Sequence, residues 1–456
     1  MRKIIYTSTL VLSLVALTRC TMKEHQTASS RDYHLGIITA FAEMVAADVK
    51  RIALSEPMTP AELDDLFSAA SSVAEKYGVN LYREAALPDT DLFPSSAMEG
   101  KEVLVICRGT ALAEYRQLHE DIRQLKATGN YHAWQREEMS RRFGRLLGYP
   151  NTHINNLMAA SSEFRTMPDF GIRGTNVFLY YRDLKRAERF YADVLGFELV
   201  ADHGMAKIFR MTKHSFLTLV DATKGMHTAD EPKTVAIALV TENLEAWHDY
   251  LKKQPVKFKY EFNYKPNKPH DGFVVEDPEG YLLEFERFNP HRENENFLPG
   301  LVNKPAVRVS GKPSPLAPEL FIHTTVTWLY YNDMLRQQQF MEDVLGFPLV
   351  VDQGWAKVYR VLGSSYIGLV DGRRGMHTAT DKKAVNIGFM LDDLDGWYTY
   401  TKTHQRFPLW EHGIKTGPTN NHREFVGFDP EGYYLEFDEF QEHPDNQLLV
   451  KAMEEQ

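Results

Sequence analysis

The chain has 456 residues and a formal net charge of −10 at pH 7, so we expect no nucleic-acid partner and no attraction to an anionic membrane surface. Only two cysteines are present, Cys20 and Cys107, which excludes a disulfide framework and a cysteine-based zinc site. The length is typical of about three domains.

The first twenty residues resemble an export signal. Arg2 and Lys3 are basic, and the apolar run over 4–17 is too short to span a bilayer comfortably. Cys20 follows, as in bacterial lipoprotein signals in which the cysteine is lipidated, although Arg19 stands where a small residue is typical. We expect export to a bacterial cell envelope, lipid-anchored or periplasmic, with membrane contact only through the N-terminus. Plain secretion, a signal anchor and a cytosolic start are the alternatives.

Residues 21–31 are predicted to be a polar tether, and 32–170 a mostly helical N-terminal domain. Thr59-Pro60-Ala61-Glu62 is typical of a helix start, with Thr59 as the cap, and Gly78 is the predicted end of that helix. A strand is predicted over 101–107, with Cys107 as a small buried hydrophobic side chain. Further helices are predicted over 111–126 and 133–147.

This N-terminal region offers no catalytic constellation. Its histidines, His119, His132 and His153, are scattered. We interpret the charged residues of the helix over 133–147 as a solvated helix face. These are Glu137, Arg141, Arg142 and Arg145.

From residue 173 the pattern changes to short strands alternating with single helices. The order β-α-β-β-β is predicted twice before residue 288. The predicted strands cover 176–181, 197–201, 206–211, 216–220, 234–240, 256–260, 272–275 and 281–288, and the helices cover 184–195 and 244–253.

A second copy of this region begins near residue 321. Val194-Leu195-Gly196-Phe197 returns 150 residues later, and Asp277-Pro278-Glu279-Gly280 returns 152 residues later as Asp429-Pro430-Glu431-Gly432. Such self-similarity predicts a duplicated domain, with copies at 173–288 and 321–440. The Pro-rich joint over 289–320 is predicted to be a semi-rigid linker. Residues 441–456 remain as a C-terminal tail.

Two β-α-β-β-β units per copy, a Leu-Gly-Phe after the first helix and a closing Asp-Pro-Glu-Gly-Tyr-x-x-Glu-Phe resemble the vicinal oxygen chelate superfamily. That superfamily includes glyoxalase I, extradiol dioxygenases and bleomycin-resistance proteins. The resemblance implies an α+β fold of two tandem vicinal-oxygen-chelate domains, each of two βαβββ modules whose sheets wrap into an open cleft. It also implies metal ligands of the His, Gln or Glu type on the first and last strands of the modules in the metal enzymes of the group.

Mapped onto this chain, the family pattern retains few metal ligands. The closing glutamates Glu284 and Glu436 are the candidate metal ligands. The other mapped positions are Asn176 and Val326 on the first strands, Ala236 and Asn386 in the second modules, and Thr218 and Gly368 on late strands. One carboxylate with an amide is a poor site for a catalytic divalent ion. A divalent metal is therefore possible but not expected with the standard ligands.

Other polar residues recur in register between the copies. Lys207 with Lys357, and Arg210 with Arg360, either line a cleft for a polar or anionic ligand or point outward from an amphipathic strand. Asp221 with Asp371, and His227 with His377, are interpreted as residues that stabilise a loop. The large aromatic residues at helical positions are predicted to be core. These are Phe190, Trp247, Phe340 and Trp397.

Three functions are compatible with this pattern, and no catalytic residue is assigned. The first is binding of a small molecule in a cleft without a standard catalytic metal site. The second is a divalent-metal lyase, isomerase or dioxygenase with atypical ligands, such as Glu284 with His203, His214 or His227. The third is a structural or interaction lipoprotein. The oligomeric state is not predicted.

Overall fold

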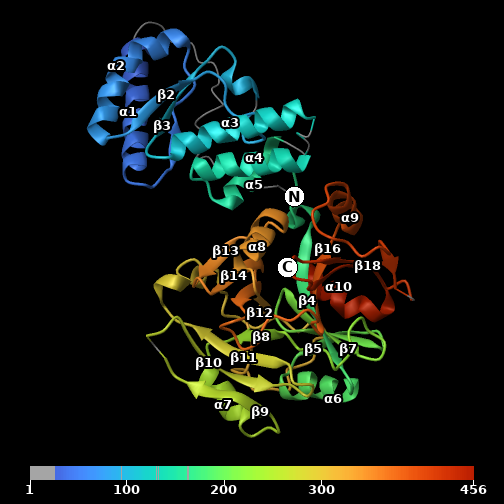
Figure 1. The fold of residues 1–456 in the computed structure, drawn as a ribbon. Coiled ribbons are helices and arrows are strands. Elements are labelled where there is room, and N and C mark those ends of the chain that lie inside the picture. Colours follow the sequence, from blue (N-terminus) through green and yellow to red (C-terminus); the bar gives the residue numbers. More distant parts are fainter. Residues whose placement is uncertain are drawn as a thin grey trace. The chain divides into compact units, whose positions relative to one another are not determined.

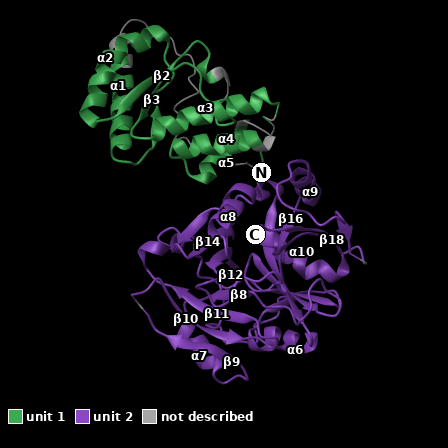
Figure 2. Ribbon diagram, in the orientation of Figure 1, with its two compact units in different colours: residues 1–164 green, residues 165–456 purple. Residues whose placement is uncertain are grey.

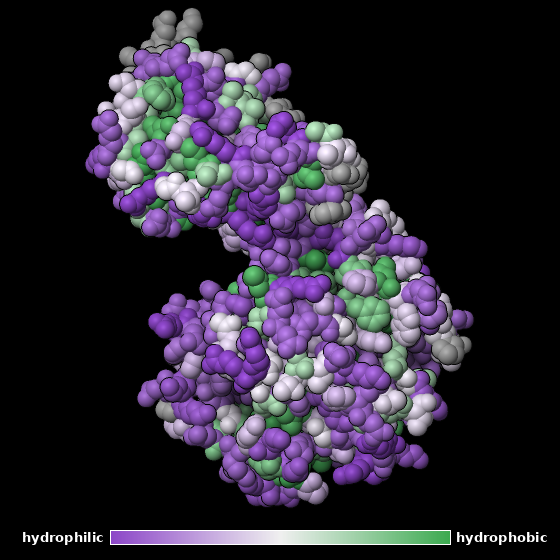
Figure 3. Space-filling model, viewed as in Figure 1, coloured by the Kyte–Doolittle hydropathy of each residue, from purple (hydrophilic) through white to green (hydrophobic). Residues whose placement is uncertain are grey.

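The computed structural model describes residues 26–93, 95–129, 131, 133–161, 164–265, 267–417 and 419–455. It contains two compact units, residues 1–164 and 165–456 (Figure 2). The predicted export signal with Cys20, and also His132, lie outside the described residues. Among the helices that are described, none is long and apolar enough to cross a membrane. The visible surface is mostly hydrophilic (Figure 3).

The described part of the first unit combines five α-helices with a small antiparallel sheet. The sheet order is β1-β3-β2, with β1 at Ile52–Leu54, β2 at Asn80–Glu84 and β3 at Val103–Cys107. Each residue of β3 is buried, as the apolar run predicts, and Cys107 is one of them. The helices are α1 (Gln26–Ala46), α2 (Pro60–Tyr77), α3 (Ala111–Ala127), α4 (Ala133–Leu146) and α5 (Asn151–Ser161).

Helix α2 begins and ends as its sequence predicts. The backbone N–H of Glu62 donates to the Thr59 hydroxyl, and the Glu62 carboxylate accepts from the backbone N–H of Thr59 at 2.8 Å. Gly78 adopts a left-handed conformation with φ of 64°. This reciprocal cap satisfies N–H groups that the first turn leaves unpaired.

Two expectations for this unit need correction. Helix α1 starts at Gln26, so residues 26–31 are helical where a tether was predicted. The interpretation of α4 as a solvated face is wrong for Arg141, which is 1% exposed. Its guanidinium lies 2.9 Å from both the Glu137 carboxylate and the Asn155 side-chain oxygen, and stacks over the Phe164 ring. Helical periodicity shows which residues share a face, but not which neighbouring helix covers that face.

The second unit contains two eight-stranded sheets (Figure 1). The β4 sheet has the order β17-β18-β19-β16-β4-β7-β6-β5, and the β12 sheet has the order β13-β14-β15-β12-β8-β11-β10-β9. The strands of the first copy are β4 (Ile172–Tyr181), β5 (Glu198–Asp202), β6 (Ala206–Arg210), β7 (Ser215–Asp221), β8 (Val235–Val240), β9 (Lys257–Asn263), β10 (His270–Glu276) and β11 (Leu282–Phe288). Those of the second copy are β12 (Thr324–Tyr331), β13 (Leu349–Asp352), β14 (Ala356–Leu362), β15 (Ser365–Asp371), β16 (Val385–Leu391), β17 (Lys415–Thr416), β18 (His422–Phe428) and β19 (Tyr434–Phe440).

Each module also carries a helix after its first strand, as predicted. These helices are α6 (Leu184–Arg189), α7 (Leu244–Leu251), α8 (Met334–Gln339) and α9 (Leu394–Thr403). In the first module of each copy the helix ends in a π-helical turn, η3 (Phe190–Val194) or η6 (Phe340–Val344).

Each sheet takes one module from each copy. In the β4 sheet, β4 of the first copy pairs antiparallel with β16 of the second. In the β12 sheet, β12 of the second copy pairs antiparallel with β8 of the first. The two modules that share a sheet are therefore far apart in sequence, and each concave face is built from both copies.

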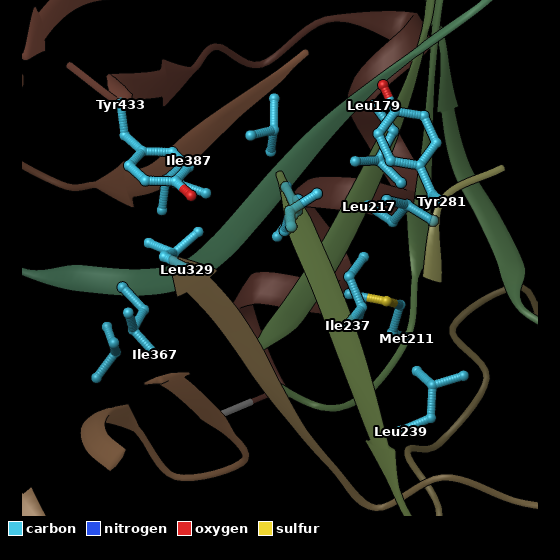
Figure 4. Packing of buried hydrophobic residues seen from close by; sticks show 14 of the residues in the cluster. Leu179, Met211, Leu217, Ile237, Leu239, Tyr281, Leu329, Ile367, Ile387 and Tyr433 are labelled. Carbon is cyan, nitrogen blue, oxygen red and sulfur yellow. The ribbon is translucent and has the colours of Figure 1, made fainter. Parts of the chain in front are cut away.

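The strands alternate between two environments. Along β8, Val235, Ile237 and Leu239 belong to a large apolar core that both sheets and their helices share (Figure 4). Ala236, Ala238 and Val240 point to the other face and belong to a separate cluster on the β12 sheet. This is the two-residue period of a strand. The predicted core aromatics are buried in the shared core. They are Phe190, Trp247, Phe340 and Trp397.

The repeated Asp-Pro-Glu-Gly-Tyr motif joins the two sheets. Asp277, just before β11 of the β12 sheet, accepts from its own turn and from the Tyr181 hydroxyl of β4 at 2.7 Å. The Tyr281 hydroxyl accepts from the Tyr180 backbone N–H at 2.9 Å and donates to the Ala384 carbonyl at 2.7 Å. The bonds to Tyr181, Tyr180 and Ala384 each cross from one sheet to the other.

The second copy repeats these contacts with the two sheets exchanged. Asp429, before β19 of the β4 sheet, accepts from the Tyr331 hydroxyl of β12 at 2.8 Å. Tyr433 accepts from the Tyr330 N–H at 2.9 Å and donates to the Thr234 carbonyl at 2.7 Å. Figure 4 shows Tyr281 and Tyr433 within the shared core. We call the two sets of contacts the inter-sheet clasps.

The joint and the C-terminal segment are packed against the sheets. Phe297 of the joint is buried on the β12 sheet, and Val309 is buried on the β4 sheet. Most of the predicted tail forms η7 (Pro444–Asn446) and helix α10 (Gln447–Glu454). Leu449 of α10 is fully buried against the β4 sheet.

The clasps predict a specific cost for losing a hydroxyl group. Tyr281→Phe or Tyr433→Phe should each lower the free energy of unfolding by about 1–3 kcal/mol, because each leaves a buried N–H and a carbonyl unpaired. Urea denaturation measures the loss. Tyr264→Phe, at a side chain that is 63% exposed, is the control and should change stability by less than about 0.5 kcal/mol. Equal stability of the clasp variants and the control would contradict the role of the clasps.

Candidate functional site

Because strands of the two copies pair with each other, the polar residues at the mapped family positions lie together on one sheet. Asn176, Thr218, Asn386 and Glu436 all belong to the β4 sheet. The Thr218 hydroxyl donates to Asn176 Oδ1 at 2.8 Å, and Asn386 Nδ2 donates to Glu436 Oε2 at 2.5 Å. The first two side chains therefore bond to each other, and Glu436 is the one carboxylate of the set.

The corresponding positions of the β12 sheet are apolar except for Glu284. Val326 lies opposite Ala238, and Gly368 lies beside Trp328. Ala236 pairs with Leu282, two residues before Glu284. A lone carboxylate among alkyl groups does not provide the three or so protein ligands that a catalytic divalent ion needs. The family metal positions therefore do not fit a metal on this sheet.

The β12 sheet instead forms an open cleft with a volume of about 300 Å³. Aromatic side chains and methionine contribute most of its large lining groups, and two carboxylates lie among them. The lining residues are Tyr260, His270, Glu284, Glu286, Phe288, Trp328, Tyr330, Val351, Gln353, Trp355, Ala356, Val358, Val370, Arg374, Gly375 and Met376. We call this space the aromatic cleft.

Burial keeps the two carboxyl groups of the aromatic cleft from ionising readily. It raises the pKa of Glu284 to about 7. Burial, with the neighbouring charges of Glu284 and Asp271, raises the pKa of Glu286 well above its usual range. His270 Nδ1 lies 3.6 Å from Glu286 Oε1, and burial lowers the pKa of this imidazole. At neutral pH His270 therefore does not provide a positive charge next to Glu286.

Two residues that line the aromatic cleft each hold a buried polar atom that lacks a hydrogen-bond partner. These atoms are the indole Nε1 of Trp328, a donor, and Oε2 of Glu286. Both residues are buried, with Glu286 only 1% exposed. Unpaired buried polar groups cost free energy, so each of these atoms could gain from a ligand that bonds to it.

The concave face of the β4 sheet is filled by the protein itself. Val309 of the joint and Leu449 and Ala452 of α10 pack against Phe216 and Ile208. Beside them, Glu424, Glu436 and Asp438 each offer one oxygen, and these oxygens lie within 4.8 Å of one another. Burial raises the pKa of Asp438 to about 8. We call these three residues the carboxylate cluster.

The recurring lysines and arginines do not line the aromatic cleft, and all but one form structural contacts. Lys207 Nζ pairs with Asp202 at 2.5 Å, and Lys357 Nζ pairs with Asp352 at 2.6 Å, each within a hairpin. The structure separates the two arginines. Buried Arg210 donates to the Val307 and Ala452 carbonyls and so fixes the joint and α10. Arg360 is exposed.

The histidines proposed as partners of Glu284 lie with the other sheet. His203 Nε2 is 2.9 Å from Asn446 Oδ1, and the imidazole of His214 contacts the Ser364 hydroxyl. His227 forms the predicted loop contact, with Nδ1 2.7 Å from Glu231. The structure therefore does not bring these histidines together with Glu284 as a ligand set.

Three carboxylates of these sites were not predicted. Glu286 and Asp438 each follow a family glutamate by two residues, so the strand period places them on the same face. Glu-Phe-Glu and Glu-Phe-Asp in the closing motifs carry that signal in the sequence. Glu424 lies opposite Asp438 on β18, and only the strand register shows this.

Residues 175–285 match the model of the Glyoxalase/Bleomycin resistance protein/Dioxygenase superfamily. The chain thus carries a domain of this superfamily, and its fold is a duplication of that domain type. No curated protein matches the chain.

Several solved structures are similar to the chain. Glyoxalase I from Zea mays is 13% identical, with a TM-score of 0.41, over 62% of this chain and 95% of that one. The cppA protein from Streptococcus pneumoniae is 13% identical, with a TM-score of 0.34, over 59% of this chain and 98% of that one. At these identities and TM-scores, neither likeness says what this chain does.

The raised pKa of Glu284 predicts a pH-dependent loss of stability. An unfolded glutamate ionises near 4.5, so this contribution is complete below that pH and is lost as the pH rises through about 7. Glu284→Gln should therefore match the wild type at pH 4.5 and be more stable by about 1–3 kcal/mol at pH 8. Urea denaturation at both pH values measures the difference. Glu411→Gln, at an exposed position, should show no such trend, and a pH-independent effect of Glu284→Gln would refute the prediction.

Proposed function

We propose that the protein binds a small organic cation with a flat apolar part in the aromatic cleft, without the standard catalytic metal site of the superfamily. The observation that carries the proposal is a cleft of about 300 Å³ whose aromatic lining includes two acids, Glu284 and Glu286. Two of its lining residues also hold a buried polar atom without a partner, Trp328 Nε1 and Glu286 Oε2. A cleft of this size accommodates a small ligand, and a few placed polar groups among apolar ones are typical of ligand sites.

The lining residues indicate the class of ligand. Trp328, Tyr330 and Trp355 are among the lining residues, and aromatic rings attract flat apolar groups and cations. Glu284 and Glu286 provide carboxyl oxygens next to these rings. A protonated amine that bonds to Glu286 would favour the ionised carboxylate, and its flat part would lie against the indole and phenol rings.

The acids inside the cleft, rather than the arginine that also lines it, are consistent with a cationic ligand. Arg374 is exposed, and its guanidinium lies 5.2 Å from the centroid of the Trp355 ring. The guanidinium therefore covers one face of that ring. The lining also contains the acids Glu284 and Glu286 and the imidazole of His270, whose pKa is lowered by burial. An anionic ligand would therefore meet carboxyl groups inside the cleft.

Calorimetry with a matched pair of probes tests the proposal. At pH 7.5, 1-naphthylmethylamine should bind at least about tenfold more tightly than 1-naphthylacetate, which has a similar ring and the opposite charge. Amine binding should also release protons, because it lowers the pKa of Glu286 and Glu284. The enthalpy in buffers of different ionisation heat reports that release.

Variants locate the binding. Glu286→Gln should weaken amine binding about tenfold or more and reduce proton release, and Trp328→Phe should weaken binding of the amine. Glu276→Gln, on the same hairpin but paired with Lys257, is the matched control and should bind as the wild type does. Equal affinity for the two probes, or amine binding that is insensitive to Glu286→Gln, would overturn the proposal.

A further inference from the structure

The aromatic cleft contains one guanidinium group that the proposed function does not use. Arg374 lines the cleft together with Trp355, and its guanidinium lies 5.2 Å from the centroid of the Trp355 ring. The side chain is exposed, and within the described part of the chain it forms no ion pair. A guanidinium that lies on a ring face still has N–H groups at its edge, and these can bind a carboxylate through two parallel bonds.

A comparison of the two copies shows why Arg374 is unpaired. Its counterpart 150 residues earlier is Lys224, whose Nζ lies 3.8 Å from Asp221 at the end of β7. In the second copy Arg373 binds the equivalent acid, Asp371, with bonds of 2.8 and 2.7 Å. Because Asp371 already has this partner, the guanidinium of Arg374 stays available to a ligand.

The segment that carries Arg374 lies against the aromatic lining of the cleft. A side chain at Gly375 would collide with the ring of Tyr330, so the glycine lets this segment approach that ring closely. The indole beneath the guanidinium is specific to this copy, because Met205 stands where the second copy has Trp355. The equivalent positions of the β4 sheet thus hold a lysine and a methionine, and the stacked arginine belongs to the aromatic cleft.

The acids of the cleft lie on a different strand from this arginine. Glu284 and Glu286 are on β11, whereas Arg374 follows the end of β15. Strands β8 and β12 separate them, so the backbones are about 14 Å apart along the sheet at about 4.8 Å per strand. Among the residues that the structure describes, no ion pair joins Arg374 to either acid. The cleft therefore offers opposite charges that do not neutralise each other.

Aromatic surface connects the two charged ends. The Tyr330 ring lies beside Gly375, the neighbour of Arg374. Burial, with the nearby charge of Glu284, raises the pKa of the Tyr330 phenol, so this side chain also faces the acids. A ligand that reaches both ends needs a flat part between its two charges. An α-amino acid carries its amine and its carboxylate on one carbon and does not meet this requirement.

We propose that the ligand of the aromatic cleft is dipolar, with an amine that bonds to Glu286 and Glu284 and a carboxylate, at the far end of its flat part, that binds Arg374. This assignment rests on the proposed function and narrows its class of ligand. Bonds from a guanidinium to a carboxylate are charge-assisted and stronger than bonds to a neutral amide. Arg374 therefore selects for the second charge, and the acids select for the first.

Calorimetry at pH 7.5 with matched naphthalene probes tests this assignment. The probes are 5-(aminomethyl)-1-naphthoate, its primary amide and 1-naphthylmethylamine. The naphthoate should bind about tenfold more tightly than its amide, because only the naphthoate presents a carboxylate to Arg374. In Arg374→Gln this advantage should fall below about twofold, while binding of 1-naphthylmethylamine should not weaken. Arg374→Lys keeps the charge but not the planar fork, so it should keep only part of the advantage.

A control variant and the set of probes separate the possible outcomes. Lys224→Gln changes the counterpart of Arg374 outside the cleft, and it should leave the affinities for all of the probes unchanged. Amine binding in which the naphthoate has no advantage over its amide, or keeps that advantage in Arg374→Gln, would overturn the dipolar ligand alone. Failure of every probe to bind would overturn the proposed function and the dipolar ligand with it.

Discussion

The second unit depends on two buried carboxylates, Asp277 and Asp429, that organise a turn in one sheet and hold a tyrosine of the other. Burial raises the pKa of Asp429 to about 6, while bonds from Tyr331 and from its own turn lower it. Each clasp also bonds one copy to the other, because Tyr281 donates to the Ala384 carbonyl and Tyr433 donates to the Thr234 carbonyl. Because every sheet takes one module from each copy, neither copy buries its core alone. The duplicated sequence is thus one folding unit.

Local features of this unit were predictable, and long-range ones were not. Strand periodicity, helix caps and the Asp-Pro-Glu-Gly turn depend on neighbours within a few residues, and these elements were confirmed. The pairing of β4 with β16 joins residues more than 200 positions apart, and two similar copies offer the same edges to either partner. The burial of Arg141 and the position of α10 were not predicted for the same reason, because both depend on contacts between residues far apart in the sequence.

This pairing explains how two similar copies form two different sites. Asn176 and Thr218 of one copy share a sheet with Asn386 and Glu436 of the other, whereas Glu284 shares a sheet with Val326 and Gly368. The polar positions thus collect on the sheet that α10 covers. The apolar ones collect on the sheet that forms the aromatic cleft. The aromatic cleft and the carboxylate cluster thus lie on different sheets, and which modules are neighbours determines the residues of each.

Cleavage of the joint tests the cross-copy architecture most directly. Residues 302–305 are exposed, so a protease recognition sequence inserted there can be cut in the folded protein. The two fragments should then elute together in size-exclusion chromatography without denaturant, and separate only when the sheets unfold. Fragments that part under native conditions, each compact and folded, would contradict the account, because they would show that each copy forms its own sheets.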